Sequence, residues 1–231
     1  MAVRSLTGSN RLDSETLKPW SIVALIGLGG QGILFVALHF LSTEFDSTVN
    51  FVSEYSLGRF AWLMAAANLF GITGKIALLG ALHTAGIAPL RSLIGGLMTV
   101  HILALGVLFV FPIDSIEHAF ADGGVPNFTT SGWIHALSGL IASVTMIISA
   151  VLITVRIAQS GLLKSGYKAL IPLCVVAPAA YIAMFTTQPG MYPAGLYQRL
   201  YLIAIIGWLL IVAYGLFAGK FGDAGRDTER A

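Results

Sequence analysis

Six apolar stretches of roughly 20 residues alternate with short polar segments along this chain. Each stretch is long enough to cross a bilayer core of about 30 Å as an α-helix. The pattern therefore predicts an all-α membrane protein, a six-transmembrane-helix bundle. The expected spans are residues 20–41, 59–82, 91–111, 132–155, 169–187 and 199–219.

Polar tails flank these spans, which predicts an N-terminal tail (1–19), a single transmembrane domain (20–219) and a C-terminal tail (220–231). Hydrophobic residues make up 56% of the chain and charged residues only 10%, whereas a soluble domain is about 25% charged. Most of the surface must therefore meet lipid. A net charge of +2 without a basic stripe does not favour nucleic-acid binding.

Basic residues predict the orientation of the bundle. If the N-terminus is inside, the internal segments carry ten Lys and Arg residues, and the external segments carry only Arg59 and Arg199. Lys75 lies within the second span, close enough to its inner end for the side chain to snorkel. This bias follows the positive-inside rule. We therefore expect both termini in the cytoplasm and the protein in the cell (inner) membrane.

Two features inside the spans predict how the helices pack. The run from Gly27 to Gly32 matches G-x-G-x-x-G, but it lies within a span rather than after a strand, so a dinucleotide site is rejected. Its glycines instead favour close approach of a neighbouring helix, with Gln31 hydrogen-bonded across the contact. Pro172 and Pro178 are expected to kink or loosen the fifth span, because each removes a backbone donor.

Charged residues gather where three spans enter from the predicted outer side. Arg59, His135 and Arg199 open the second, fourth and sixth spans, where helix dipoles add positive charge. We expect an outward-facing polar pocket that binds an anionic or lipid head group. Its residues would be Glu54, Arg59, Asp114, His135 and Arg199. The simpler alternative is that these charges only neutralise one another at the interface.

His135 also supports an enzymatic alternative. A cap at Thr129, Thr130 or Ser131 would place it about one turn inside its helix. An imidazole there can act as a general base oriented by Asp114, in a membrane-embedded lipid hydrolase or transferase. A structural hydrogen bond from His135 to a carboxylate or carbonyl is the competing interpretation.

The sequence leaves open whether the protein binds a metal ion or a haem. His39, His118, His135 and Asp114 provide ligands of the types zinc prefers, although no pair has the spacing of H-E-x-x-H. Haem ligation would use His101, near the middle of the third span, but no second histidine lies at the same depth.

A third functional alternative is an accessory or structural subunit of a larger membrane complex. The expected partners are membrane lipids and, in that case, other membrane-protein subunits.

Four of these segments also carry a family resemblance. In order and placement they resemble the domain-of-unknown-function 998 (DUF998) family of multi-pass membrane proteins, mostly from prokaryotes, over about residues 20–219. The Ser53–Glu54 element is also similar to one in the Frag1/DRAM/Sfk1 group of six-helix proteins, some of which are linked to lipid handling. The resemblance implies a multi-pass fold and no particular activity. The four segments are Ser53–Gly58, Phe111–Asp114, Thr130–His135 and Gln198–Arg199.

Overall fold

The computed structural model describes residues 14–119, 126–160, 166–187 and 193–218. Within these ranges the chain forms helices and no strands. Six helices are long and apolar enough to cross a membrane, which confirms an all-α, multi-pass membrane protein. They are α1 (Ser14–Leu41), α2 (Ala61–Thr84), α3 (Leu93–Val110), α5 (Thr130–Ser160), α6 (Leu170–Thr186) and α7 (Ala194–Phe217). Three short elements join them: η1 (Val52–Leu57), α4 (Ile116–Ala119) and η2 (Gly166–Ala169).

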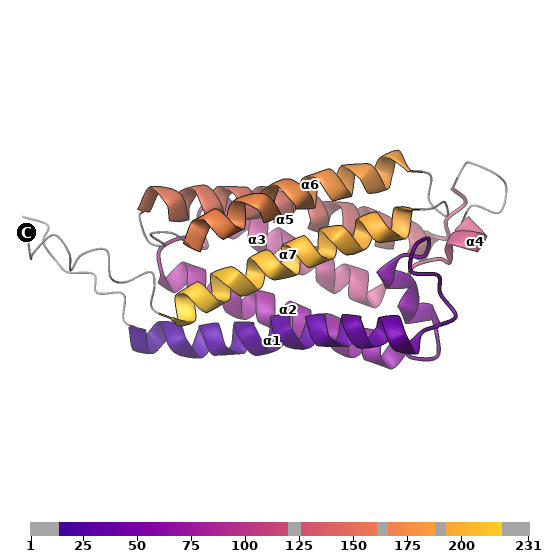
Figure 1. Ribbon diagram of the computed structural model, residues 1–231, viewed down its shortest axis with the longest axis horizontal. Helices are drawn as coiled ribbons and strands as arrows, with labels where there is room; N and C mark the ends of the chain where they lie inside the picture. The colour runs from indigo at the N-terminus through magenta and orange to yellow at the C-terminus, as the bar shows by residue number, and fades with distance from the viewer. Residues whose placement is uncertain (1–13, 120–125, 161–165, 188–192, 219–231) are drawn as a thin grey trace, which may run out of the picture.

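The six long helices lie side by side along the length of the molecule (Figure 1). Each packs against the next long helix in the sequence, and α7 packs back against α1, so the six form a closed ring. The start of α1 and the end of α7 lie at one end (Figure 1). The opposite end carries η1 and α4, and we call it the η1 end. Apolar side chains from all six helices fill the interior, among them Leu28, Leu78, Met98, Met146, Ala177 and Trp208.

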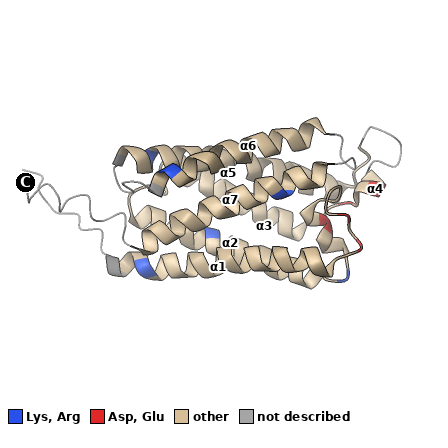
Figure 2. Cartoon of the chain, in the orientation of Figure 1, with Lys and Arg blue, Asp and Glu red and all other residues tan. Residues whose placement is uncertain are grey.

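The acidic residues and several of the basic residues lie at opposite ends of the bundle (Figure 2). The acidic residues whose side chains the structure describes all lie at the η1 end: Glu44, Asp46, Glu54, Asp114 and Glu117. Lys18, Arg91, Arg156 and Lys168 belong to the other end. The fold thus keeps apart the charges on which the orientation prediction depends, and the orientation itself stays a prediction.

Two helices begin five or more residues earlier than predicted. α1 starts at Ser14, so residues 14–19 of the expected tail are helical, because Leu17 is buried in the bundle. The rest of that tail and residues 220–231 lie outside the described residues. α7 starts directly after Pro193 rather than at Arg199. Arg199 therefore lies in the second turn of its helix and not at the entrance.

The two prolines of α6 behave differently. Pro178 lies inside the helix, as predicted. Pro172 lies in the first turn, where a backbone N–H would have no acceptor within the helix, so no helical bond is lost there. The expected loss of a helical bond therefore does not apply to Pro172, and the kink expected at Pro178 stays a prediction.

Glycines bring α1 and α2 into close contact. A Cβ atom on Gly27 would lie 2.6 Å from Gly74 Cα, and one on Gly74 would lie 2.7 Å from Leu28 N. Larger residues at either position would push the helices apart. On the same face, Gln31 Oε1 accepts a hydrogen bond from Lys75 Nζ at 2.9 Å. The predicted close packing and interhelical hydrogen bond are both confirmed.

Candidate functional site

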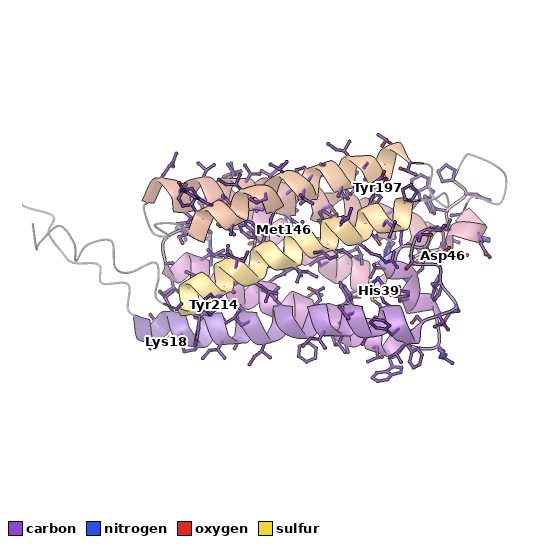
Figure 3. The ribbon with its side chains drawn as sticks, in the orientation of Figure 1. Lys18, His39, Asp46, Met146, Tyr197 and Tyr214 are labelled. Carbon is purple, nitrogen blue, oxygen red and sulfur yellow. The ribbon has the colours of Figure 1, made fainter. Side chains whose placement is uncertain are left out.

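Arg199 joins three segments of the chain at the η1 end, and its side chain is only 7% exposed. Nε donates to His39 Nε2 at 2.6 Å, and Nη2 donates to the Tyr55 hydroxyl at 2.9 Å. Nη1 donates to the backbone oxygens of Asn50 at 2.7 Å and Gly195 at 3.0 Å. These bonds connect α7 to the end of α1 and to η1, and His39 lies between α1 and α7 at this end (Figure 3).

The acceptors of Arg199 carry no formal charge. His39 Nδ1 lies 2.8 Å from Phe35 O. A carbonyl oxygen only accepts, so Nδ1 holds the proton and Nε2 presents a lone pair to Arg199. The imidazole is therefore neutral, like the Tyr55 hydroxyl and the two backbone oxygens. A buried cation is held here by four neutral groups.

Glu54 is the buried anion of the same end, 1% exposed. Its carboxylate accepts from Phe51 N at 2.8 Å, from Ile116 N at 3.0 Å and from Asn50 Nδ2 at 3.2 Å. The bond from Phe51 N stabilises the first turn of η1. Because the backbone oxygen of Asn50 accepts from Arg199, this one neutral residue separates the two buried charges.

The segment between α1 and α2, residues 42–60, rests directly on the start of α7. Gly195 N donates to Thr48 O at 3.0 Å, and a Cβ on Gly195 would lie 2.7 Å from Asn50 O. Val52 N donates to Gln198 Oε1 at 2.6 Å. Glycine at position 195 therefore permits this approach, and Gln198 fixes η1 beside Arg199.

Asp114 and Thr129 form a second polar cluster, at the start of α5. The Asp114 carboxylate accepts from Thr129 N at 2.7 Å and from Thr129 Oγ1 at 2.8 Å. Thr129 Oγ1 accepts from Gly132 N at 3.1 Å, so Thr129 is the N-cap among the three predicted candidates. A Cβ on Gly132 would collide with the Asp114 carboxylate, which thus lies against the helix N-terminus.

His135 makes a structural hydrogen bond. Its Nδ1 donates to Phe111 O at 2.8 Å, while Asp114 is bonded to Thr129. The described bonds of Asp114 go to Thr129, and its orientation of His135 as a general base stays a prediction. Of the two interpretations of His135, a bond to a carbonyl is the one observed.

The structure brings the predicted site residues into two neighbouring clusters. Glu54 and Arg199 belong to the first, and Asp114 and His135 to the second. They are connected where Glu54 accepts from Ile116 N, two residues after Asp114. Arg59 lies outside both: it is exposed, its Nη2 donates to Leu41 O at 3.2 Å, and its guanidinium covers the Phe60 ring. Asp122, in the same acidic loop as Asp114, lies outside the described residues.

The residues predicted for zinc do not converge. Across the described ranges, no group of three or more His, Cys, Asp and Glu side chains is arranged to hold a metal ion. His39 already uses both ring nitrogens, and His118 is exposed on α4. His101, the residue considered for haem, has Nδ1 bonded to Ala142 O at 2.8 Å.

Asp46 is one of two exposed acids in residues 42–60, together with Glu44, and Figure 3 shows Asp46 at the η1 end. Its carboxylate accepts from Thr48 N at 2.8 Å and from Thr48 Oγ1 at 2.7 Å. Because both bonds favour the charged form, they lower the pKa of Asp46; desolvation opposes them, and Arg199 adds a smaller lowering. Asp46 therefore stays ionised beside the Arg199 network.

Lys75 does not snorkel as predicted. Its side chain is 4% exposed, and Nζ bonds to Gln31 Oε1 at 2.9 Å and to Gly71 O at 3.4 Å. A Cβ on Gly71 would collide with the Gln31 amide, so this glycine makes room for the pair. Gly27 and Gln31, like Gly71 and Lys75, are four residues apart and share a helix face. That spacing was the signal in the sequence for this buried contact.

The contacts pair the segments that carry the family resemblance. Ser53–Gly58 meets Gln198–Arg199 through the bonds of Tyr55 and Val52. Phe111–Asp114 meets Thr130–His135 through the bond between Phe111 and His135. Residues 25–215 match the family model for "Protein of unknown function (DUF998)". No curated protein and no solved structure matches the chain.

Proposed function

The chain belongs to the DUF998 family, and we propose that this member is an integral membrane protein whose η1 end binds an anionic or lipid head group through Arg199. The family description states no activity, so the proposal rests on the chemistry of the site. The single observation that carries it is a buried guanidinium whose described acceptors are all neutral.

Burial of a charge is costly unless an opposite charge and hydrogen bonds compensate it. Around Arg199 the hydrogen bonds are present, but Glu54 is separated from the guanidinium by Asn50. The described bonds also leave one N–H of the guanidinium for a further acceptor. A phosphate or carboxylate would supply both the charge and an acceptor for that N–H.

Ser42 gives independent support. Its Oγ is buried and has no hydrogen-bond partner among the described residues. It lies one turn beyond His39, which is bonded to Arg199. A buried hydroxyl without a partner is uncommon, and it can donate to an anionic oxygen.

Glu54, Asp114 and His135 hold the surrounding segments in place in this proposal. Glu54 and Asp114 already accept hydrogen bonds from backbone N–H groups, and His135 Nδ1 donates to a backbone oxygen. They position the site, and Arg199 contacts the head group.

The test compares lipids of different head-group charge. Purified protein in a neutral detergent is mixed with dioleoylphosphatidylglycerol, dioleoylphosphatidylcholine or inorganic phosphate, and the melting temperature is measured. We expect the anionic lipid to raise it more than the zwitterionic lipid does. Arg199→Gln should abolish that difference, whereas Arg59→Gln, which removes an exposed cation at the same end, should preserve it. Stabilisation by inorganic phosphate alone would identify a free anion rather than a lipid as the ligand.

Equal stabilisation of the wild type by the two lipids, without an effect of phosphate, would overturn the proposal. So would an Arg199→Gln protein that still prefers the anionic lipid. If Arg199→Gln does not fold, Arg199→Lys keeps the charge and loses the planar guanidinium with its fixed set of N–H donors. It should show a reduced preference for the anionic lipid.

We further propose that the protein lies in the cell (inner) membrane with both termini in the cytoplasm, because ten Lys and Arg residues then lie towards the inner side and only Arg59 and Arg199 towards the outer side. Glu117→Cys and Arg91→Cys, each in a Cys174→Ala background, place a thiol at opposite ends of the bundle. An impermeant thiol reagent should label position 117 but not position 91 in intact cells. The reverse pattern would invert the topology.

A further inference from the structure

A hydrogen-bonded polar pair lies inside the bundle, formed by Gln31 of α1 and Lys75 of α2, and the helix packed beside α2 carries the buried His101. Lys75 lies near the middle of α2 and His101 near the middle of α3, and Gln31 lies past the middle of α1. Lys75 is 4% and His101 3% exposed. Polar groups at such depth are costly and tend to have a function, and neither the fold nor the proposed head-group site accounts for His101.

Lys75 lacks a counter-charge at this depth. Its two described acceptors, Gln31 Oε1 and Gly71 O, are neutral, and the second bond is long at 3.4 Å. The acidic side chains that the structure describes all lie at the η1 end. An ammonium group has one more N–H than these two bonds use. Lys75 thus has a donor to offer inside the bundle.

His101 offers the complementary acceptor. Its Nδ1 lies 2.8 Å from Ala142 O, a group that only accepts, so Nδ1 carries the proton and Nε2 is a bare acceptor. Nε2 is buried and has no hydrogen-bond partner among the described residues. Helix α3 packs against α2 on one side and α5 on the other. The ammonium of Lys75 is the charged group that acts electrostatically on this ring.

We propose that Lys75, Gln31 and His101 form an intramembrane site that binds a water molecule and exchanges a proton through it. A water oxygen accepts from Lys75 Nζ, and a water hydrogen is donated to His101 Nε2. Buried polar groups without a protein partner commonly bind such a water. An anion does not fit, because the bare lone pair of Nε2 repels it. A metal cation does not fit beside the Lys75 ammonium.

Proton exchange through this water is balanced. A proton passes from Lys75 Nζ to the water oxygen while another passes from the water to His101 Nε2. The products are a neutral Lys75 amine, the same water and a charged His101, so no further reactant is consumed. The elements packed against α2 are α1, α3, α7 and η1. From α1, Gln31 bonds to Lys75, and His101 lies near the middle of α3. His39 and Tyr55 bond to Arg199 at the η1 end, and Glu54 accepts from Phe51 N there. Tyr201 of α7 contacts Tyr181.

The experiment is nitrogen NMR of the full chain, labelled with ¹⁵N-histidine and reconstituted in lipid nanodiscs. Loss of a signal in His101→Gln assigns the residue. In the wild type we expect a protonated Nδ1, an Nε2 shifted by a donated hydrogen bond, and magnetisation transfer from water to the ring. In Lys75→Met the Nε2 shift should move to that of an unbonded nitrogen, and the transfer should fall severalfold. Lys18→Met removes an exposed lysine and should change neither.

An Nε2 signal that is the same in the wild type and in Lys75→Met would overturn the proposal, as would a wild-type ring that receives no magnetisation from water. If Lys75→Met does not fold, Gly71→Ala displaces Gln31 from its place beside Lys75. It should produce the same change of the His101 signal, and an unchanged signal there would also overturn the proposal.

Discussion

Arg199 and Lys75 are both buried cations in a membrane bundle, but their surroundings differ. Arg199 donates to four acceptors from three segments, and Glu54 lies on the far side of one asparagine. Lys75 donates to two acceptors, one at long distance, and its neighbour His101 has a buried nitrogen without a partner. The fold therefore depends on the first cation more than on the second. Because the hydrogen bonding of Lys75 and His101 is incomplete, we infer that a further molecule binds beside them.

The largest expected effect comes from removing the anion of the η1 end. Glu54→Ala leaves Phe51 N and Ile116 N without their acceptor and removes the buried anion that Asn50 connects to Arg199. Breaking a buried charge arrangement of this kind costs about 3–5 kcal/mol. Thermal unfolding in detergent measures the loss. Glu117→Ala, an exposed acid at the same end, is the control and should change stability by less than about 0.5 kcal/mol. Similar losses for the two variants would refute the dependence of the fold on Glu54.

A smaller difference separates Asp114 from His135. Asp114→Ala removes a charged acceptor from Thr129 and from the start of α5, at a cost of about 2 kcal/mol. His135→Ala removes one bond to Phe111 O, at a cost of about 1 kcal/mol. Unfolding of both variants in the same detergent gives the comparison. A greater loss for His135→Ala would make the imidazole, rather than the Asp114 cap, the main connection between α3 and α5.

Lys75→Met is expected to leave stability nearly unchanged or to raise it. The methionine fills a similar volume, and replacing a poorly compensated buried charge by an apolar group is often neutral or favourable, by about 1 kcal/mol or more. The melting temperature in detergent tests this. A loss as large as that for Glu54→Ala would contradict the contrast between the two cations, because Lys75 would then be a structural residue.

The smallest effect concerns Asp46 and pH. Its pKa in the folded chain is lowered from 3.8 by the bonds from Thr48, so its stabilising contribution is present above that pH and is lost as the pH falls through the lowered value. The Thr48 amide should therefore titrate with a midpoint below pH 3.8 in an NMR pH series. Asp46→Asn should abolish that titration. A midpoint above 3.8 would contradict the bonding described for residues 46–48.

The sequence predicted the spans well and the site only in outline. Hydropathy locates membrane-spanning helices because the thickness of the bilayer sets their length. The hydropathy pattern predicted all six spanning helices. It does not give rotation about the helix axis, so it could not show that Lys75 points at Gln31 rather than towards the lipid boundary. It also says nothing of which helices are neighbours. The contacts of Arg199 with His39 and Tyr55 span more than 140 residues of sequence, and neither histidine spacing nor charge clustering predicts them.

The closed ring has a consequence for biogenesis. His39, Asn50 and Tyr55 belong to the first quarter of the chain, yet they bond to a residue of the last membrane span. A ribosome delivers α1 to the membrane long before α7, so during synthesis the polar groups of residues 39–55 lack this partner. The η1 end can reach its final hydrogen bonding only after α7 has been inserted. A chain truncated before α7 would therefore keep these groups without their partner at the membrane boundary, where unpaired polar groups are costly.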